Sequence, residues 1–283
     1  MASDRKVVMI DPKKADSLYE EAIKTLRTNL QFAGRSYINH PMELNIWRAP
    51  TDNDMYIKLE WEKAHYDAAY TRAYRIEVLQ TKHGVLIMEH VAVVADTVQK
   101  ILDVKMTWKI NEDGKIEAVI EAIKDKEFPD LPRFGIRMFL NKKMDEITYF
   151  GMGPQESYRD KHQASWHGLF RSKVAQMHED YIRPQENGSH YDCDYVELTN
   201  GQCGIAAVSK NPFSFNASVY TQEELERVSH NYELKESDST VFCMDYAMNG
   251  IGSNSCGPDV LNKYRFAEEA FQFQFELIPF VKG

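Results

Sequence analysis

The strongest constraint on the fold is a strict alternation of apolar and polar side chains between residues 102 and 110. The apolar members are Leu102, Val104, Met106, Trp108 and Ile110. Successive side chains of a β-strand point to opposite faces, so this pattern predicts a strand with one buried and one solvated face. The turn over residues 111–114 ends in a glycine, which tolerates positive φ, and a second alternation follows over 116–122. Together they predict an antiparallel hairpin.

Further strand patterns recur along the chain, separated by turns that contain Gly, Asn and Pro. They cover residues 133–139, 195–199, 204–209, 213–220, 240–248 and 271–279. Such a series is typical of two antiparallel sheets packed face to face. A chain of 283 residues can bury a large core, and no long Pro, Gly or Ser linker divides the series. We therefore predict one all-β domain over residues 30–283.

Two segments show helical rather than strand periodicity. Residues 1–29 are expected to form a short N-terminal helical appendage, with a strand at 6–10 followed by a helix that reaches about Leu30. Residues 56–74 place aromatic side chains at helix-compatible intervals among charges, which predicts one amphipathic helix.

The sequence over residues 21–32 is similar to a segment that precedes the nucleotide-binding core of bacterial tyrosine kinases. A kinase of that type needs a Gly-x-x-x-x-Gly-Lys-[Ser/Thr] loop to cradle phosphates, and the chain contains none. The kinase interpretation is therefore set aside.

Charge and composition exclude several kinds of partner. The net charge of -9 at pH 7 disfavours nucleic acid and anionic membranes, because both require basic surface to replace counterions. No apolar run reaches the roughly 20 residues of a membrane span, and the first residues lack the apolar segment of a signal peptide. We therefore expect a cytoplasmic protein that acts on an uncharged ligand.

Cysteine and histidine spacing predicts neither a disulfide scaffold nor a metal site. The cysteines are Cys193, Cys203, Cys243 and Cys256, and they lack the close pairs that chelate zinc. Neither His178 nor His190 has a partner at metal-ligand spacing. We expect reduced thiols and no metal or other cofactor bound by this chain.

Residues 45–54 combine a tryptophan and an arginine with a dense polar turn. Trp47 offers a large apolar face and Arg48 a planar fork of five donors, which predicts a buried ring beside an arginine that clamps carboxylates or carbonyls. After a proline, Asp52 and Asn53 can bond to nearby amides and stabilise the turn. A structural role is expected for all of these side chains.

Two further polar turns carry glutamates. Residues 149–160 contain a Gly-x-Gly-Pro sequence, but it opens no βαβ unit that would bind a dinucleotide. In residues 181–190, the arginine close to Glu186 suggests that this carboxylate stays ionised rather than acting as an acid with a raised pKa. Glu156 and Glu186 could imitate a glycosidase pair, which needs carboxyls about 5 to 10 Å apart. The residues predicted to be structural here are Glu156, Arg183, Glu186 and Asn187.

Residues 248–258 form a glycine-rich bend with small polar side chains. Glycines leave the backbone free to reach outward, and hydroxyls and amides suit sugar hydroxyls or simply turn the chain. The residues that would line a substrate are Ser253, Asn254, Ser255 and Cys256.

Taken together, these motifs resemble those of the C-terminal domain, or separate small chain, of family 2 glycoside hydrolase β-galactosidases. The matching sequences are Trp-Arg-Ala-Pro-Thr-Asp-Asn-Asp at residues 47–54, Gly-Met-Gly-Pro-Gln-Glu-Ser-Tyr at 151–158, Pro-Gln-Glu-Asn-Gly at 184–188 and the Gly-x-Gly loop at 250–252. They occur in the family's order, so the resemblance covers about residues 30–280.

The resemblance implies a supersandwich of antiparallel sheets of the galactose mutarotase-like type. It implies a β-galactosidase that hydrolyses terminal β-D-galactosides such as lactose, with this chain closing one wall of the active site and supplying subunit contacts in an oligomer. The catalytic glutamates would lie on a (β/α)8 barrel in the catalytic domain or large subunit, and magnesium would be bound there too. Family members place the Gly-x-Gly loop in the active site, and Cys256 stands where well-known members have a tryptophan.

Two other functions are open at this stage. One is a free-standing epimerase of the mutarotase kind, which would use a His and a Glu on the concave sheet as acid and base. The other is a non-catalytic carbohydrate-binding module. A shared fold does not by itself decide between them.

Overall fold

The computed structural model describes residues 30–252 and 259–282. The strand at 6–10 and the helix predicted for the N-terminal appendage therefore lie outside the described residues, apart from Leu30. The strands are β1 (Gln31–Phe32), β2 (Arg35–Ser36), β3 (Ile38–Asn45), β4 (Tyr70–Thr81), β5 (Gly84–Ala95), β6 (Val98–Asn111), β7 (Ile116–Lys124), β8 (Arg133–Asn141), β9 (Glu146–Gly153), β10 (Trp166–Lys173), β11 (Ser189–Thr199), β12 (Cys203–Ser218), β13 (Ser239–Met248) and β14 (Ala270–Val281). The α-helices are α2 (Ile57–Lys63) and α3 (Gln222–Arg227). Short 3-10 turns are η1 (Asp52–Asp54), η2 (Tyr66–Ala68), η3 (Val174–Met177), η4 (Asn231–Glu233) and η5 (Asn262–Tyr264).

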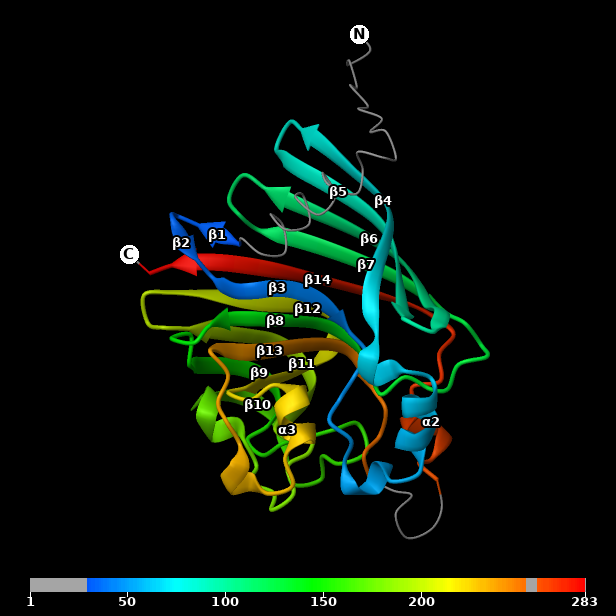
Figure 1. The fold of residues 1–283 in the computed structure, drawn as a ribbon. Helices are drawn as coiled ribbons and strands as arrows, with labels where there is room; N and C mark the ends of the chain where they lie inside the picture. The colour runs from blue at the N-terminus through cyan, green and yellow to red at the C-terminus, as the bar shows by residue number, and fades with distance from the viewer. Residues whose placement is uncertain (1–29, 253–258, 283) are drawn as a thin grey trace.

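Strands β1 and β2 form a small sheet of their own, and the other described strands form one antiparallel sheet that divides along β12 (Figure 1). The first half of β12, Cys203–Val208, pairs with β14, and the sheet continues through β7, β6 and β5 to β4. The second half, Ser214–Ser218, pairs with β13, and from there the sheet continues to β8 and β3. On its other side β12 pairs with β11, followed by β9 and β10. The two branches are the two layers of the sandwich.

Aromatic side chains fill the space between the layers. Phe134 of β8 packs edge-on against Phe271 of β14 at 4.8 Å between ring centroids, and Tyr246 of β13 stacks on the same Phe271 at 5.0 Å. Rings bury much apolar area and pack favourably in offset or edge-to-face geometry. These contacts join strands that lie far apart in the sequence into one core.

The predicted hairpin is confirmed. Strands β6 and β7 pair antiparallel, with Trp108 opposite Ala118 and Ile110 opposite Ile116. Leu102, Val104, Met106 and Trp108 are buried, as the alternation predicts. Gly114 in the connecting turn has a φ of +84°. The predicted all-β class, with antiparallel pairing throughout the described strands, is confirmed as well.

The single helix predicted over residues 56–74 is wrong. Helix α2 ends at Lys63, and His65 adopts a left-handed φ of +56°. The chain then enters β4 at Tyr70, which pairs with Val94 of β5. Trp61 and Tyr66 are both buried, but tertiary contacts hold them: the Trp61 Nε1 donates to the carbonyl of residue 130 and the Tyr66 hydroxyl to that of residue 129. Tertiary pairing, which the local pattern does not contain, decided the structure here.

Two strands predicted at 204–209 and 213–220 form one continuous strand, β12, with an irregularity between them. The polar Lys210 and Asn211 suggest a turn in the sequence, but in the structure the chain continues in the same direction and only changes its neighbour.

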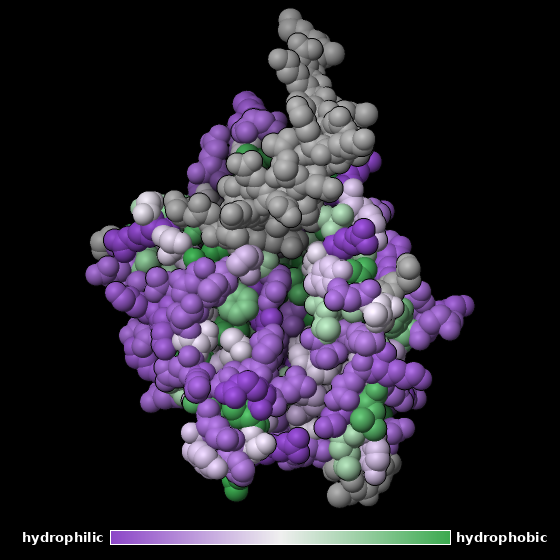
Figure 2. Space-filling model, viewed as in Figure 1, coloured by the Kyte–Doolittle hydropathy of each residue, from purple (hydrophilic) through white to green (hydrophobic). Residues whose placement is uncertain are grey.

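Figure 2 shows that the face seen in Figure 1 is covered mainly by hydrophilic residues, with apolar residues scattered among them. No helix in the described part of the chain is long and apolar enough to cross a membrane.

Candidate functional site

The motifs singled out in the sequence come together at one end of the sandwich. The backbone N–H of Glu186 donates to the carbonyl of Ala49 at 3.0 Å, and Arg48 reaches the carbonyl of Asn249 at 2.6 Å. Asp160, in the turn after β9, accepts hydrogen bonds from the backbone of residues 251 and 252. Segments separated by up to 200 residues therefore form a single structural unit.

Arg48 is the centre of this unit and is completely buried. Its Nε and Nη2 donate to both oxygens of Asp54, at 3.1 and 2.7 Å. Its Nη1 and Nη2 donate to the carbonyls of Asn249 and Gly250, at 2.6 and 3.2 Å. The guanidinium also lies 5.2 Å from the ring of Trp61, within cation–π range. A planar fork with five donors can satisfy a carboxylate and two carbonyls at once, which a lysine could not do in this geometry.

Asn53 and Asp160 hold the same backbone from other directions. The amide of Asn53 donates to the carbonyl of Ile251 at 2.8 Å. The carboxylate of Asp160 accepts from the N–H groups of Ile251 and Gly252, at 3.1 and 2.8 Å. Arg48, Asn53 and Asp160 thus bind the backbone of residues 249–252, and Asp54 holds Arg48 in place. We call these four residues the loop clamp.

The loop clamp leads directly into the candidate substrate-lining residues. Ser253, Asn254, Ser255 and Cys256 lie outside the described residues, so their assignment stays a prediction. A cavity of about 230 Å³ is lined by Asp54, Tyr56, Asn249 and Arg265, among others. Asp54 belongs to the clamp and Asn249 to the backbone that the clamp holds, so this cavity lies against the clamp.

Trp47 packs behind the clamp and is 6% exposed. Its ring meets Trp61 edge-on at 6.1 Å, its Nε1 donates to Glu226 at 3.0 Å, and its carbonyl accepts from Gln222 at 2.7 Å. The side chain thus joins the polar turn to helix α3 and is buried away from solvent. Asp52 lies at the surface, where its N–H and carboxylate pair with Gln185.

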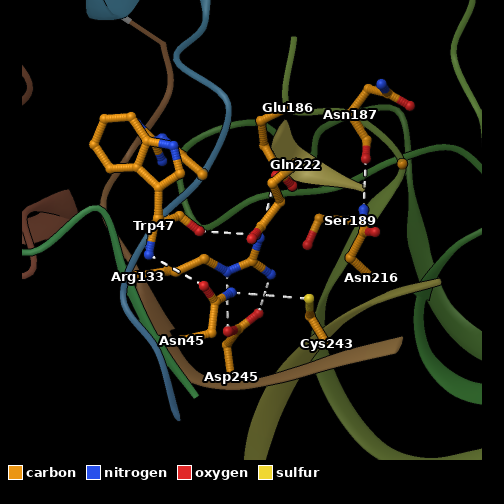
Figure 3. Close-up of polar contacts among 12 residues, drawn as sticks. Asn45, Trp47, Arg133, Glu186, Asn187, Ser189, Asn216, Gln222, Cys243 and Asp245 are labelled. Carbon is orange, nitrogen blue, oxygen red and sulfur yellow. Dashed lines mark hydrogen bonds and ion pairs between the residues drawn. The ribbon is translucent and has the colours of Figure 1, made fainter. Parts of the chain in front are cut away.

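Figure 3 shows a second group of polar contacts, a buried ion cluster around Arg133. Arg133 of β8 makes a two-point contact with Asp245 of β13, including Nε to Oδ1 at 3.0 Å, and its Nη1 lies 3.2 Å from Glu186 Oε2. The side chains of Arg133, Glu186 and Asp245 are all at most 3% exposed. Each of these buried charges is stabilised by the opposite charge beside it, so removing one leaves the other uncompensated.

The prediction that Arg183 holds Glu186 ionised is wrong. Arg183 lies at the surface, and the cations near Glu186 are Arg133 and, at longer range, Arg48. Burial raises the pKa of Glu186 in spite of both arginines. The local sequence suggests Arg183 because it is near in the chain, whereas the actual partner comes from a strand more than 50 residues away.

Glu156 and Glu186 are both engaged in structural contacts. Glu156 accepts from Lys161 and Tyr181 and from the N–H of Gly188 at 2.9 Å. Asn187 bridges the same turn, since its side chain accepts from the N–H of Glu179 and donates to the carbonyl of Gln185. With side chains 6% and 3% exposed, both glutamates are almost fully withdrawn from solvent.

His190 follows this turn and is 1% exposed. Its Nδ1 bonds to the carbonyl of Met152 at 3.0 Å, and its ring stacks on Phe215. Burial lowers the pKa of His190 to about 4. A histidine that is neutral and enclosed at neutral pH is poorly suited to the acid or base role of an epimerase.

The lowered pKa of His190 predicts acid sensitivity. The unfolded histidine titrates near 6.5, so the stability gained from the neutral folded form is complete above pH 6.5 and is lost as the pH falls toward 4. Between pH 7 and pH 5 we expect the free energy of unfolding to fall by about 2 kcal/mol more in the wild type than in His190→Gln. Urea unfolding at both pH values measures this difference. Equal losses in the two proteins would contradict the assignment of a neutral, buried His190.

The structure also tests which residues could hold a metal. Among the described residues, no group of three or more His, Cys, Asp and Glu side chains has a geometry that could bind a metal ion. Cys193, Cys203 and Cys243 are free and buried.

Sequence reasoning missed Arg133, Asp160 and Asp245. Asp245 gives the clearest signal in retrospect, because it is a lone charge within the apolar strand β13 and a fully buried carboxylate requires a partner. Arg133 and Asp160 stand next to turns, where charged side chains are common, so neither is conspicuous.

The fold and the site define an antiparallel β-sandwich domain that holds a glycine-rich loop through a buried arginine. A family model described as "Beta galactosidase small chain" matches residues 22–277. This chain belongs to that family.

Two curated relatives illustrate the match. A β-galactosidase of Actinobacillus pleuropneumoniae is 46% identical over 255 residues, which are 90% of this chain and 25% of the relative. A β-galactosidase of Staphylococcus xylosus is 37% identical, over 82% of this chain and 23% of the relative. The chain thus spans about a quarter of the length of these relatives. Among solved structures, a galactose mutarotase-like protein of Lactobacillus casei matches 88% of this chain and 90% of its own at 10% identity and a TM-score of 0.41.

Proposed function

We propose that this chain is the part of a β-galactosidase that holds one wall of the active site, in an enzyme that hydrolyses terminal β-D-galactosides such as lactose. The observation that carries the proposal is the loop clamp. Side chains from two separate turns, Arg48 and Asn53 from one and Asp160 from the other, fix the backbone of residues 249–252, directly before the polar segment at 253–256. A binding segment is more precise when its base is rigid.

In this proposal the chemistry is divided between two parts of the enzyme. The remaining three quarters, represented by the relatives' additional length, carry the acid, the nucleophile and the magnesium. Our chain contributes loop positioning and subunit contacts, with Ser253, Asn254, Ser255 and Cys256 facing the galactoside. The buried free thiols support a reducing, cytoplasmic location.

A chimera tests this function. We expect the 283-residue chain alone to leave a chromogenic galactoside unchanged. When the chain replaces the corresponding quarter of the Actinobacillus enzyme, the chimera should hydrolyse it. In the chimera, Arg48→Met should lower kcat/KM by about tenfold or more, because a misplaced loop loses contacts to the transition state.

Arg75→Met is the matched control, since this arginine is 73% exposed and its ion pair to Glu77 lies on the surface. It should leave kcat/KM unchanged. Turnover by the isolated chain that disappears in Glu156→Gln or Glu186→Gln would overturn the proposal. A folded Arg48→Met chimera with unaltered kinetics would do the same for the role of the clamp.

A further inference from the structure

The sheet branch that runs from β14 to β4 has more strands than the branch that runs from β13 to β3. The shorter branch ends at β3, which pairs with β8 and with no other described strand. The longer branch ends in the hairpin of β4 and β5, which Figure 1 shows at the upper end of the molecule, away from β3. The longer branch therefore extends beyond the strand that ends the other layer.

The strand register identifies the side chains of this hairpin that face the core side of the sheet. Val78 of β4 lies opposite Ile87 of β5, which lies opposite Trp108 of β6. Trp108 is buried, and its ring meets Phe275 edge-on at 6.1 Å. Because successive side chains alternate between the two faces of a sheet, every second residue along each strand shares the face of Trp108.

We call this surface the hairpin face. Its apolar members are Ile76, Val78, Val85, Ile87 and Ile110. Two polar residues, Gln80 and Glu89, stand at its two ends. An apolar surface of five side chains is thus presented on the core side of the hairpin.

Most of the hairpin face is only partly covered. Val78 is 54% exposed, and the other four apolar members are half-buried. Burial also changes along β5, since residues 84–88 are half-buried and residues 91–95 are buried. The 12-residue edge strand β4 pairs only with β5 among the described strands. Proteins usually cover such long apolar edges with a helix or a loop.

The described part of the chain begins beside this face. The ring of Phe32 lies so close to Gly114, in the turn between β6 and β7, that a side chain at Gly114 would clash with it. Gly84, where β5 begins, lies opposite Asn111 at the same end of the sheet. Leu30 and Phe32 pack against the main core, and the Leu30 carbonyl accepts from the N–H of Tyr37 at 3.0 Å. The residues that precede Leu30 therefore start at one end of the hairpin face.

The sequence before Leu30 has the pattern that such a face requires. Leu18, Ala22, Ile23 and Leu26 recur at helical spacing, while Lys24 and Thr28 fall on the opposite side of a helix. A helix over residues 16–29 would be roughly 21 Å long. The strand from Gly84 to His90 covers about 20 Å, so the lengths match.

We propose that residues 16–29 cover the hairpin face, with the stripe of Leu18, Ala22, Ile23 and Leu26 packed on Val78, Val85 and Ile87. The segment then continues the shorter layer beyond β3 and covers the edge of the sheet at β4. This inference does not require the chain to take part in galactoside hydrolysis.

The direct test is methyl NMR on the complete 283-residue chain. We expect nuclear Overhauser contacts between the methyl groups of Ile23 or Leu26 and those of Val78, Val85 or Ile87. Absence of every such contact in the folded protein would overturn the inference and leave the hairpin face available to the rest of the enzyme.

Thiol labelling provides a second test, with Val78→Cys as the reporter. All proteins carry Cys256→Ser, so that the added cysteine is the reactive thiol, since Cys193, Cys203 and Cys243 are buried. Adding Leu26→Asp should speed the labelling of Val78→Cys by about tenfold or more, because an aspartate on the stripe disfavours packing on an apolar surface. Thr28→Asp is the matched control, since it adds the same charge on the opposite side of the helix, and it should leave the rate unchanged.

Arg75→Cys reports on the other face of β4, because Arg75 lies opposite His90 and is out of phase with Val78. Leu26→Asp should not change its labelling rate. Equal rates for Val78→Cys with and without Leu26→Asp would overturn the inference, as would an equal increase with Thr28→Asp. If Leu26→Asp unfolds the protein, the three buried cysteines react as well, and the methyl contacts of the wild type then decide. Neither readout involves galactoside hydrolysis, so this inference and the proposed function can fail separately.

Discussion

Replacing Arg133 with methionine is expected to lower the free energy of unfolding by about 3 to 5 kcal/mol. The guanidinium lies between Asp245 and Glu186 in a site that is almost fully buried. Removing it leaves two carboxyl groups without their counter-ion, and burial already raises the pKa of both. Chemical denaturation at pH 7 measures the loss.

Arg137→Met is the matched control, because Arg137 lies on the same strand, and its partners Glu43 and Glu223 have side chains 41% and 60% exposed. Water can solvate these two carboxylates when the guanidinium is removed, so the free energy of unfolding should fall by about 1 kcal/mol or less. Adding Asp245→Asn to Arg133→Met should recover part of the stability, since it removes one uncompensated charge. Equal losses for Arg133→Met and Arg137→Met would contradict the burial argument.

Trp47→Ala should be comparably damaging, with a loss of about 3 to 5 kcal/mol, because a buried indole and its packing against Trp61 are removed. The substitution also leaves Glu226 without the indole N–H. Such a loss is a large part of the net stability of a domain, so a lower melting temperature or a failure of soluble expression is the expected result.

Trp166→Ala is the control for removing the same side chain from the surface, since Trp166 is 59% exposed. It should change stability by about 0.5 kcal/mol or less. A Trp47→Ala protein that melts normally but binds sugar differently would refute the structural role of Trp47.

Only part of the loop clamp could be predicted from the sequence. The pattern around Arg48 predicts an arginine that clamps carboxylates or carbonyls, and the structure shows both kinds of acceptor, Asp54 nearby and Asn249 far along the chain. The nearby acceptor is visible in the sequence because its spacing is short. The distant one is not, because it depends on how the end of β13 and the segment between β3 and η1 meet in space.

The ion cluster and the course of β12 could not be predicted from the sequence for the same reason. Glu186 has an arginine three positions before it in the chain, yet its partner is Arg133. Strand β12 changes its neighbour at the place where the sequence suggests a turn between two strands. Pairing between distant strands decides both features.

By itself, the sequence determined the strand class, the hairpin of β6 and β7 and the family motifs, because alternation and turn chemistry act between residues that are close in the chain. Tertiary structure alone decided that residues 70–81 form a strand rather than the end of a helix, that β12 is shared by both layers, and which charges are paired in the interior. The physical reason is that burial and strand pairing depend on the partner, and a local pattern of apolar and polar residues does not identify that partner.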